Sequence, residues 1–203
     1  MKSHGHADQV WPLTVAEIEN KAVVARTQLL PDYGRQSVIS HKVNMDHLLQ
    51  VTLPRKLGIE LHVCEDAELP DSLAEFDADS DVLSIRSSIM ERARQFWPEA
   101  LFTIYHEIAH VILHRKQVFA RRSATKSTVG QIRSVEDQAD YGAMALAIGS
   151  EAALQIQCAV SLARISQMPL ERCTAYLAQL KKGCENKNGA RLPSSANMEF
   201  DFD

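Results

Sequence analysis

The sequence lacks the features that mark several classes of protein. Among its 203 residues it has only four cysteines, Cys64, Cys158, Cys173 and Cys184, and none of them forms a Cys-x-x-Cys pair. Cysteines this widely spaced favour reduced structural thiols over a disulfide framework or a redox sensor. No apolar run approaches the roughly 18 residues of a membrane-spanning helix, and the N-terminus lacks the apolar run of a signal peptide. We therefore expect a cytoplasmic protein with no membrane partner.

An excess of basic charge is also absent. The chain has 22 Lys and Arg against 26 Asp and Glu, a net charge of −4, which argues against binding of nucleic acid by the whole domain. Apolar residues make up 45% and charged residues 24%, as is usual for a folded globular chain. The length suffices for one sizeable core. No internal repeat is evident, and no feature specifies an oligomeric state.

Hydrophobic periodicity and capping residues predict an α+β fold that is mostly helical, with a small antiparallel β-sheet. Helices are expected at residues 13–30, with Thr14 as the N-cap, and at 44–55, 98–113, 134–149, 151–166 and 169–182. Strands are expected at residues 59–63 and 82–86. The acidic segment 65–81 between them predicts a solvated loop or weak hairpin. A calcium site is disfavoured because the segment lacks the Gly-containing EF-hand pattern.

The helix expected at 98–113 contains the sequence His-Glu-Ile-Ala-His at positions 106–110. Residues four apart on a helix differ by about 40° in direction and about 6 Å along the axis. The imidazoles of His106 and His110 can therefore bind one metal ion. Glu107 projects beside the pair, where it could take a proton from a metal-bound water. This motif predicts a metal-dependent hydrolase.

Glu136, in the first turn of the next expected helix, supplies a third ligand. Two His and one Glu form a set that hydrolytic zinc sites use, with one position open for water, although manganese, cobalt or iron also accept it. Asp140 lies one turn beyond Glu136, at the right offset to accept the second ring N–H of a ligand histidine. The alternative is that His106 and His110 are ordinary core histidines. Burying two imidazoles and a carboxylate without a metal would be costly.

Four further residues are candidate contacts to the substrate or the transition state: Tyr105, His114, Arg133 and Tyr141. Each also has an alternative interpretation as a packing or surface residue. His114 lies about 12 Å from His106 along the helix axis, too far for both to hold one ion. For His114 we therefore expect a structural role or a contact to substrate. An extended substrate could pair with the edge of the strand at 82–86.

The sequence HEIAHVILH, followed by Glu136, Ala139 and Asp140, resembles the ImmA/IrrE metallopeptidases. The order of elements over residues 40–180 is similar as well. The family usually has Gly where Ala109 stands, often Asn where Asp140 stands, and a Leu-Met-Pro-like end where this chain has residues 146–149. Many relatives carry a fused helix-turn-helix, and none is clear here.

This resemblance implies a zincin-like metallopeptidase with His106, His110 and Glu136 as Zn²⁺ ligands and Glu107 as general base. It also implies a substrate, a helix-turn-helix repressor whose cleavage releases genes of mobile elements or stress responses. The expected organisation is an N-terminal helical arm, the metallopeptidase domain, C-terminal helices packed on it and a flexible tail. These parts span residues 1–40, 41–150, 151–183 and 184–203.

Two alternative functions would use the same residues differently. One is a non-hydrolytic, zinc-stabilised regulatory module that binds a repressor or nucleic acid. Its basis is a set of basic residues between His110 and Glu136 with no acidic residue among them, namely Arg115, Lys116, Arg121, Arg122, Lys126 and Arg133. The other is the toxin of a toxin–antitoxin pair. Glu107 favours an enzyme, because structural zinc sites are closed by four protein ligands and need no base.

Overall fold

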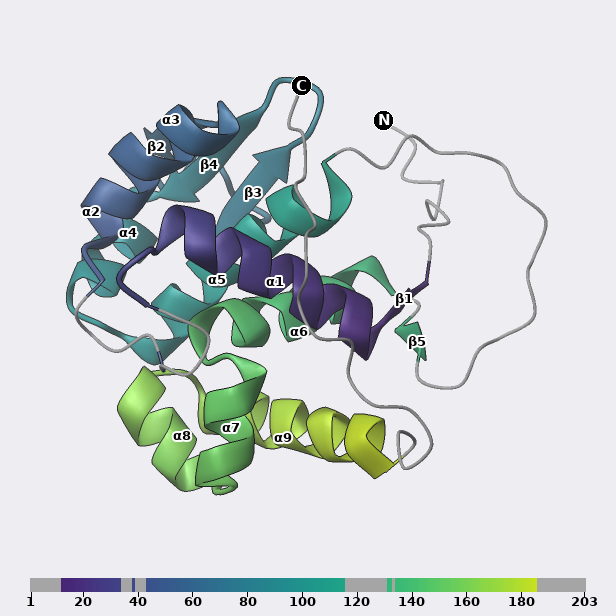
Figure 1. Cartoon of the computed structure of the whole chain (residues 1–203). Coiled ribbons are helices and arrows are strands. Elements are labelled where there is room, and N and C mark those ends of the chain that lie inside the picture. Colours follow the sequence, from purple (N-terminus) through teal and green to yellow (C-terminus); the bar gives the residue numbers. More distant parts are fainter. Residues whose placement is uncertain (1–11, 34–37, 39–42, 116–130, 133, 186–203) are drawn as a thin grey trace.

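Helix α5 (Pro98–His114), which carries the His-Glu-Ile-Ala-His sequence, lies at the centre of the molecule (Figure 1). The computed structural model describes residues 12–33, 38, 43–115, 131–132 and 134–185. Helices α1 (Val15–Leu29) and α6 (Val135–Ala147) pack against α5. The sheet lies on one side of these three helices and the C-terminal helices lie on the other. The His-Glu-Ile-Ala-His sequence is thus held between two parts of the fold.

The remaining helical segments complete this arrangement. Near the sheet lie α2 (Met45–His47), the π-helical turn η1 (Leu48–Thr52), α3 (Leu53–Leu57) and α4 (Ser87–Arg94). At the opposite end lie α7 (Ser150–Ile156), α8 (Ala159–Ser166) and α9 (Leu170–Glu185). Two short strands, β1 (Leu13–Thr14) and β5 (Gln131–Ile132), form a separate antiparallel pair. None of the helices in the described ranges is both long and apolar enough to cross a bilayer.

The main sheet has three strands in the order β2-β4-β3. Strand β4 (Val82–Arg86) pairs in parallel with β2 (Glu60–Cys64) and antiparallel with β3 (Ala74–Asp77). The sheet is therefore mixed, and the expectation of an antiparallel sheet is wrong, because the β3–β4 hairpin places β4 beside β2 in the same direction. Strand β4 is the central strand, so it has no free edge for a substrate. The outer strand beside α5 is β3.

The acidic segment before β4 uses its carboxylates in turns and caps. Asp77 Oδ1 accepts the N–H of Asp79 at 2.9 Å and its Oδ2 accepts the hydroxyl of Ser80 at 2.6 Å, which closes the β3–β4 hairpin. Asp66 accepts the N–H of Ser88 at 3.2 Å near the start of α4. The prediction of a hairpin in this segment is confirmed, and these carboxylates satisfy backbone and hydroxyl groups.

Two of the expected helices differ in the structure, and α4 was not expected. The helix expected at 44–55 is interrupted by η1, where the N–H of Leu53 bonds to the carbonyl of Leu48, five residues back. Pro54, next in the chain, lacks an N–H and would clash with an α-helical carbonyl four residues back, so a wider turn is favoured. The helix expected at 151–166 is two helices, because Gln157 has a left-handed backbone (φ 52°) and ends α7.

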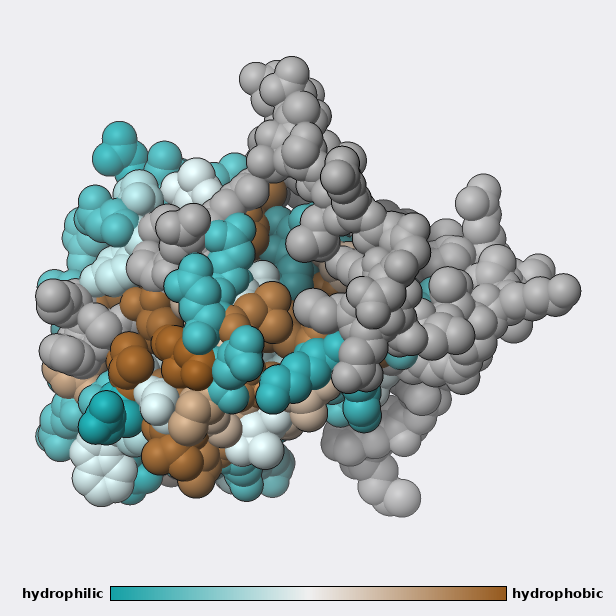
Figure 2. Space-filling view, turned by 60° about the horizontal axis from the view of Figure 1, so that its bottom comes forward, coloured by the Kyte–Doolittle hydropathy of each residue, from teal (hydrophilic) through white to brown (hydrophobic). Residues whose placement is uncertain are grey.

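One apolar core connects these elements. Among the side chains that α1 buries are Ile18 and Leu29, and α5 buries Ile104 and Ile108 in the same core. The N-cap Thr14 and Glu17 form the reciprocal hydrogen bonds of a capping box, which fixes where α1 begins. Figure 2 shows the end formed by α7, α8 and α9, where brown and teal surface alternate. Exposed apolar side chains in α8 and α9 are Val160, Ile165 and Leu170.

Candidate metal centre

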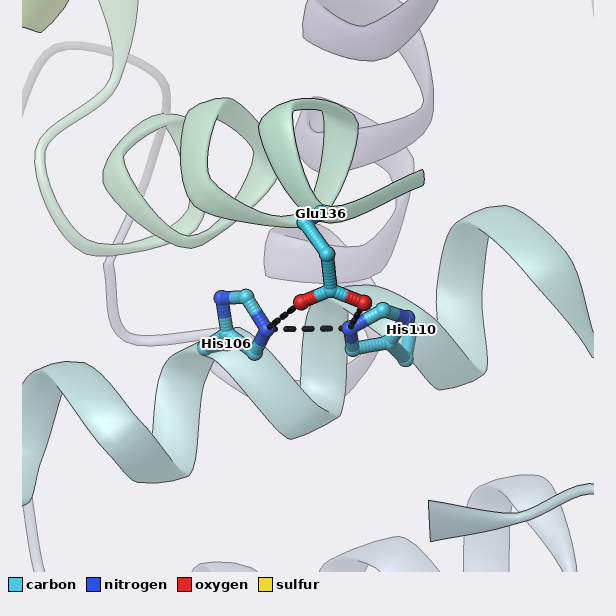
Figure 3. A group of neighbouring side chains, drawn as sticks. All are labelled: His106, His110 and Glu136. Carbon is cyan, nitrogen blue, oxygen red and sulfur yellow. Dashed lines mark hydrogen bonds and ion pairs between the residues drawn. The ribbon is translucent and has the colours of Figure 1, made fainter. Parts of the chain in front are cut away.

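His106 and His110 project from the same face of α5. The helix forms here because Pro98 suits the first helical position and the following residues are largely apolar. The two imidazoles are one turn apart, and their Nε2 atoms approach to 2.9 Å (Figure 3). Each side chain is only 16% exposed. The predicted pairing of these two histidines is thus present in the fold.

Glu136 reaches the same point from the first turn of α6. The side chain of Ser134 accepts the N–H of Asp137 at 3.3 Å, and this N-cap fixes the start of the helix. Glu136 Oε2 lies 3.2 Å from His106 Nε2, and its Oε1 lies 3.7 Å from His110 Nε2. Figure 3 shows the carboxylate lying across the two rings. Its side chain is 71% exposed, so the group opens toward solvent on this side.

Gly142 permits the close approach of α6 to α5. A Cβ atom at this position would lie 3.0 Å from Ala109 Cβ and 2.9 Å from Leu113 Cδ1. Ala109 sits one residue before His110, so the small side chains at 109 and 142 set the helix spacing next to the ligands. This spacing allows Glu136 to reach both imidazoles.

Asp140 orients the His106 ring. Its Oδ1 lies 2.9 Å from His106 Nδ1, as expected for a carboxylate one turn beyond Glu136. The hydrogen bond places the ring proton on Nδ1 and directs the Nε2 lone pair toward Glu136 and His110.

His114 orients the His110 ring through a chain of hydrogen bonds. The Gln138 amide donates from Nε2 to the carbonyl of Ile132 at 2.9 Å, so its Oε1 accepts from His114 Nε2 at 3.0 Å. His114 Nδ1 is then an acceptor for the N–H of His110 Nδ1, 3.2 Å away. His110 Nε2 consequently carries a lone pair. His114 is therefore no part of the ligand group, and it contacts His110 instead.

The Nε2 atoms of His106 and His110 and a carboxylate oxygen of Glu136 suit a metal ion because all three can act as acceptors. With their Nδ1 protons donated outward, the neutral rings present both Nε2 lone pairs to each other and to the Glu136 carboxylate. Ligand atoms around tetrahedral zinc, with bonds of about 2.0–2.1 Å, lie about 3.3 Å apart. The separations of 2.9, 3.2 and 3.7 Å bracket that value. His106, His110 and Glu136 thus form a group that could hold a metal ion.

Burial and neighbouring charges shift the pKa values of these groups in different directions. Burial, together with the neighbouring His106, lowers the pKa of His110, so its ring is neutral at pH 7. Burial also acts to lower the pKa of His106, but the bond to Asp140 and the nearby carboxylates outweigh it and the pKa is raised. Burial raises the pKa of Glu107 to about 7 despite the opposing charge of His106. A carboxyl with this pKa suits proton transfer near neutrality.

Two of the candidate substrate contacts, Tyr105 and Tyr141, are buried in the core. Tyr141 is 3% exposed, and its hydroxyl donates to Glu19 Oε1 at 2.8 Å. Tyr105 is 2% exposed, and its hydroxyl is buried near the charge of Arg26. Neither hydroxyl is directed at the ligand group, because each lies on a face of its helix that packs on α1. Arg133 lies outside the described residues.

Arg115 is the one member of the basic set between His110 and Glu136 that falls within the described ranges. Its guanidinium pairs with Asp81 at 2.6 Å and also donates to the carbonyl of Leu57. These bonds tie the end of α5 to the sheet. Arg115 thus has a structural role within the protein that requires no bound nucleic acid or acidic partner protein.

Sequence reasoning missed three groups that touch the site. The N–H of Phe76 in β3 donates to Glu107 Oε2 at 3.0 Å. Gln138 holds His114, and Arg172 in α9 pairs with Asp140. Each is brought to its partner by tertiary packing.

No family model, curated protein or solved structure matches this chain. The resemblance to the ImmA/IrrE metallopeptidases therefore stays a prediction.

Proposed function

We propose that this protein is a zinc-dependent endopeptidase that cleaves one partner protein, a helix-turn-helix transcriptional repressor. The observation that carries the proposal is the convergence of His106, His110 and Glu136. Glu107, the next residue after His106, adds a half-buried carboxylate. Three ligands and a nearby base are the set with which hydrolytic zinc enzymes activate water. The repressor as substrate rests on the resemblance to the ImmA/IrrE metallopeptidases alone.

Each residue of the site would have a distinct chemical role in peptide hydrolysis. His106 and His110 offer neutral Nε2 lone pairs, and Glu136 offers one negative charge from the exposed side. A zinc ion bound there would lower the pKa of a water molecule and polarise the scissile carbonyl. Glu107, anchored by one oxygen at the Phe76 N–H, would accept the water proton and return it to the leaving amine nitrogen.

The substrate would bind as an extended peptide along β3. This strand is the outer strand of the sheet and lies beside α5. The N–H of Phe76 points away from β4 and toward Glu107, so the free edge of β3 faces the base. Main-chain hydrogen bonds at such an edge hold a peptide without regard to its sequence, and side-chain pockets supply specificity.

Metal content and cleavage together test the proposal. The purified full chain should contain about one zinc per molecule, and His110→Ala and Glu136→Ala should lose it. His62→Ala, at an exposed histidine of β2, is the matched control and should keep it. Cleavage should be followed by mass spectrometry on the repressor encoded beside the gene and on a mixed peptide library.

The outcomes separate the proposal from its alternatives. A cut repressor or peptide, lost with the metal, supports the endopeptidase. Bound zinc with repressor and library intact overturns it in favour of a binding module. Toxicity on expression that requires Glu107, with the repressor uncut, would favour a toxin that acts on another target.

A further inference from the structure

Arg172 joins the C-terminal helix to the candidate metal centre. It lies in the first turn of α9, and its guanidinium Nη1 donates to Asp140 Oδ2. The other oxygen of Asp140 lies 2.9 Å from His106 Nδ1. One carboxylate is therefore held at both ends, by Arg172 on one side and by a ligand histidine on the other.

A second contact fixes the guanidinium itself. The Arg172 Cζ atom lies 4.5 Å from the centre of the Phe102 ring, within the range of a cation–π interaction. Phe102 is one turn before His106 on α5, and their rings are 6.0 Å apart. Arg172 thus contacts both α5 and α6, the two helices that carry the ligands. Its side chain is 37% exposed and that of Asp140 is 28% exposed, so the pair is partly shielded from solvent.

We propose that Arg172 is a positioning residue for the metal site, which fixes the Asp140 carboxylate so that His106 Nε2 is aimed at the ion. Without Arg172, the carboxylate can rotate, and the His106 ring loses a fixed acceptor for its Nδ1–H. The ligand then has to be ordered when metal binds, which lowers affinity. The inference rests on the metal-binding part of the proposed function and does not depend on proteolysis.

A merely structural role for Arg172 would have different consequences for thermal stability and zinc affinity. If the residue only tied α9 to the body of the protein, its loss would lower the thermal stability of the metal-free protein. Zinc affinity of the folded fraction would not change. The two roles therefore separate when stability and affinity are measured on the same variants.

The variants remove different parts of the Arg172 side chain. Arg172→Met keeps the apolar stem and removes the charge and the hydrogen bond. Arg172→Lys keeps the charge but loses the planar group that stacks on Phe102. Glu171→Gln is the control, because Glu171 is the adjacent residue, 80% exposed, and lies 3.9 Å from Arg172 Nε.

Zinc affinity should be measured on the full chain by competition with a chromophoric chelator, beside thermal unfolding of the metal-free protein. We expect Arg172→Met to weaken zinc binding about tenfold, Arg172→Lys to restore part of the loss, and Glu171→Gln to have no effect. Asp140→Asn should weaken binding as well, and adding Arg172→Met to it should cost little more, because the two residues act in series.

A nitrogen NMR spectrum of the zinc-free protein gives an independent readout. At a pH above the raised pKa of His106, where its ring is neutral, the wild type should hold the proton on Nδ1, and Arg172→Met should show a mixture of tautomers. Unchanged zinc affinity in Arg172→Met, or full additivity with Asp140→Asn, would overturn the inference while leaving the proposed function intact. A wild-type protein that binds no zinc would overturn the proposed function, and this inference with it.

Discussion

The backbone N–H of Phe76 donates a hydrogen bond to Glu107 Oε2 at 3.0 Å. The donor belongs to the outer strand of the sheet and the acceptor to the helix that carries the ligand histidines. A carboxylate has two oxygens, so Glu107 can accept this N–H with one and a water proton with the other. The bond connects the edge where a peptide would pair with the group that would act on it.

Replacing Glu107 by Gln should abolish cleavage and leave zinc binding unchanged. The amide oxygen of Gln still accepts the Phe76 N–H, so the side chain stays in place, but an amide cannot take the proton of the water. Loss of a general base lowers the rate by roughly 10²–10⁴-fold. Zinc content and the rate of substrate cleavage are measured on the same preparation, with wild type as reference. Retained cleavage would exclude Glu107 as the base.

Replacing His114 by Leu should weaken zinc binding without removing a ligand. His110 would lose the acceptor for its Nδ1–H, so its ring would no longer be held with Nε2 toward the ion. Loss of a residue that orients a ligand histidine lowers metal affinity by about 10–100-fold. Chelator competition measures the change, and His62→Leu serves as an exposed control. An affinity equal to that of wild type would mean that His110 needs no such partner.

The ligand group could be predicted from the sequence because its residue types, and their spacing within each helix, are typical of hydrolytic zinc sites. Four-residue spacing on one helix sets the His106–His110 pair, and a capped helix start sets Glu136 and Asp140. Glu136 and Asp140 meet His106 across 30 and 34 residues of chain, but they belong to a recognised ligand pattern. Phe76 and Arg172, which meet their partners across 31 and 32 residues, belong to no such pattern and could not be predicted. Local propensity carries no information on such contacts.

In the fold, too, some features depend on the local sequence and others depend on tertiary packing. The helix boundaries set by Thr14 and Ser134 follow from side-chain caps and were accessible to sequence reasoning. The parallel pairing of β2 with β4 was not, because strand direction within a sheet depends on how the hairpin docks. The break at Gln157 was also missed, because this residue adopts a left-handed backbone without the glycine that usually marks such a turn.

Replacing Gly142 by Ala should destabilise the protein and weaken zinc binding. The new Cβ would lie 3.0 Å from Ala109 Cβ, which cannot move away without shifting α5. Overpacking of about 1–3 kcal/mol would outweigh the gain of about 1 kcal/mol in helix propensity, so we expect a net loss of about 1 kcal/mol in the free energy of unfolding. Chemical denaturation measures this value, and chelator competition follows the effect of wider helix spacing on the ligands.

A double variant provides the control for this argument. Adding Ala109→Gly removes the opposing Cβ, so the pair Ala109→Gly and Gly142→Ala should be more stable than the sum of the single changes predicts. Simple additivity would show that the helices are not in tight contact at this point.

Replacing Glu19 by Gln should stabilise the protein increasingly as pH rises. Both Tyr141 and Tyr176 donate their hydroxyls to Glu19 Oε1, at 2.8 and 2.9 Å, and the carboxylate is buried. Burial raises the pKa of Glu19, and the two tyrosine hydrogen bonds and the charge of Arg26 offset this only in part. A Gln oxygen can accept the same two hydroxyls, so the variant keeps the hydrogen bonds and loses the buried charge.

The sign of the pH dependence follows from this raised pKa. A carboxyl that holds its proton more tightly in the folded than in the unfolded protein contributes most to stability below its unfolded pKa. That contribution is lost as pH rises through the folded pKa, because folding then requires the carboxylate to be buried as an ion. Thermal unfolding of wild type and Glu19→Gln should therefore diverge from acidic toward neutral pH, with the variant melting higher. Glu60→Gln, at an exposed position of β2, should show no such divergence. If Glu19→Gln instead melts lower than wild type at neutral pH, the carboxylate is ionised and stabilising, and its charge interaction with Arg26 outweighs the cost of burial.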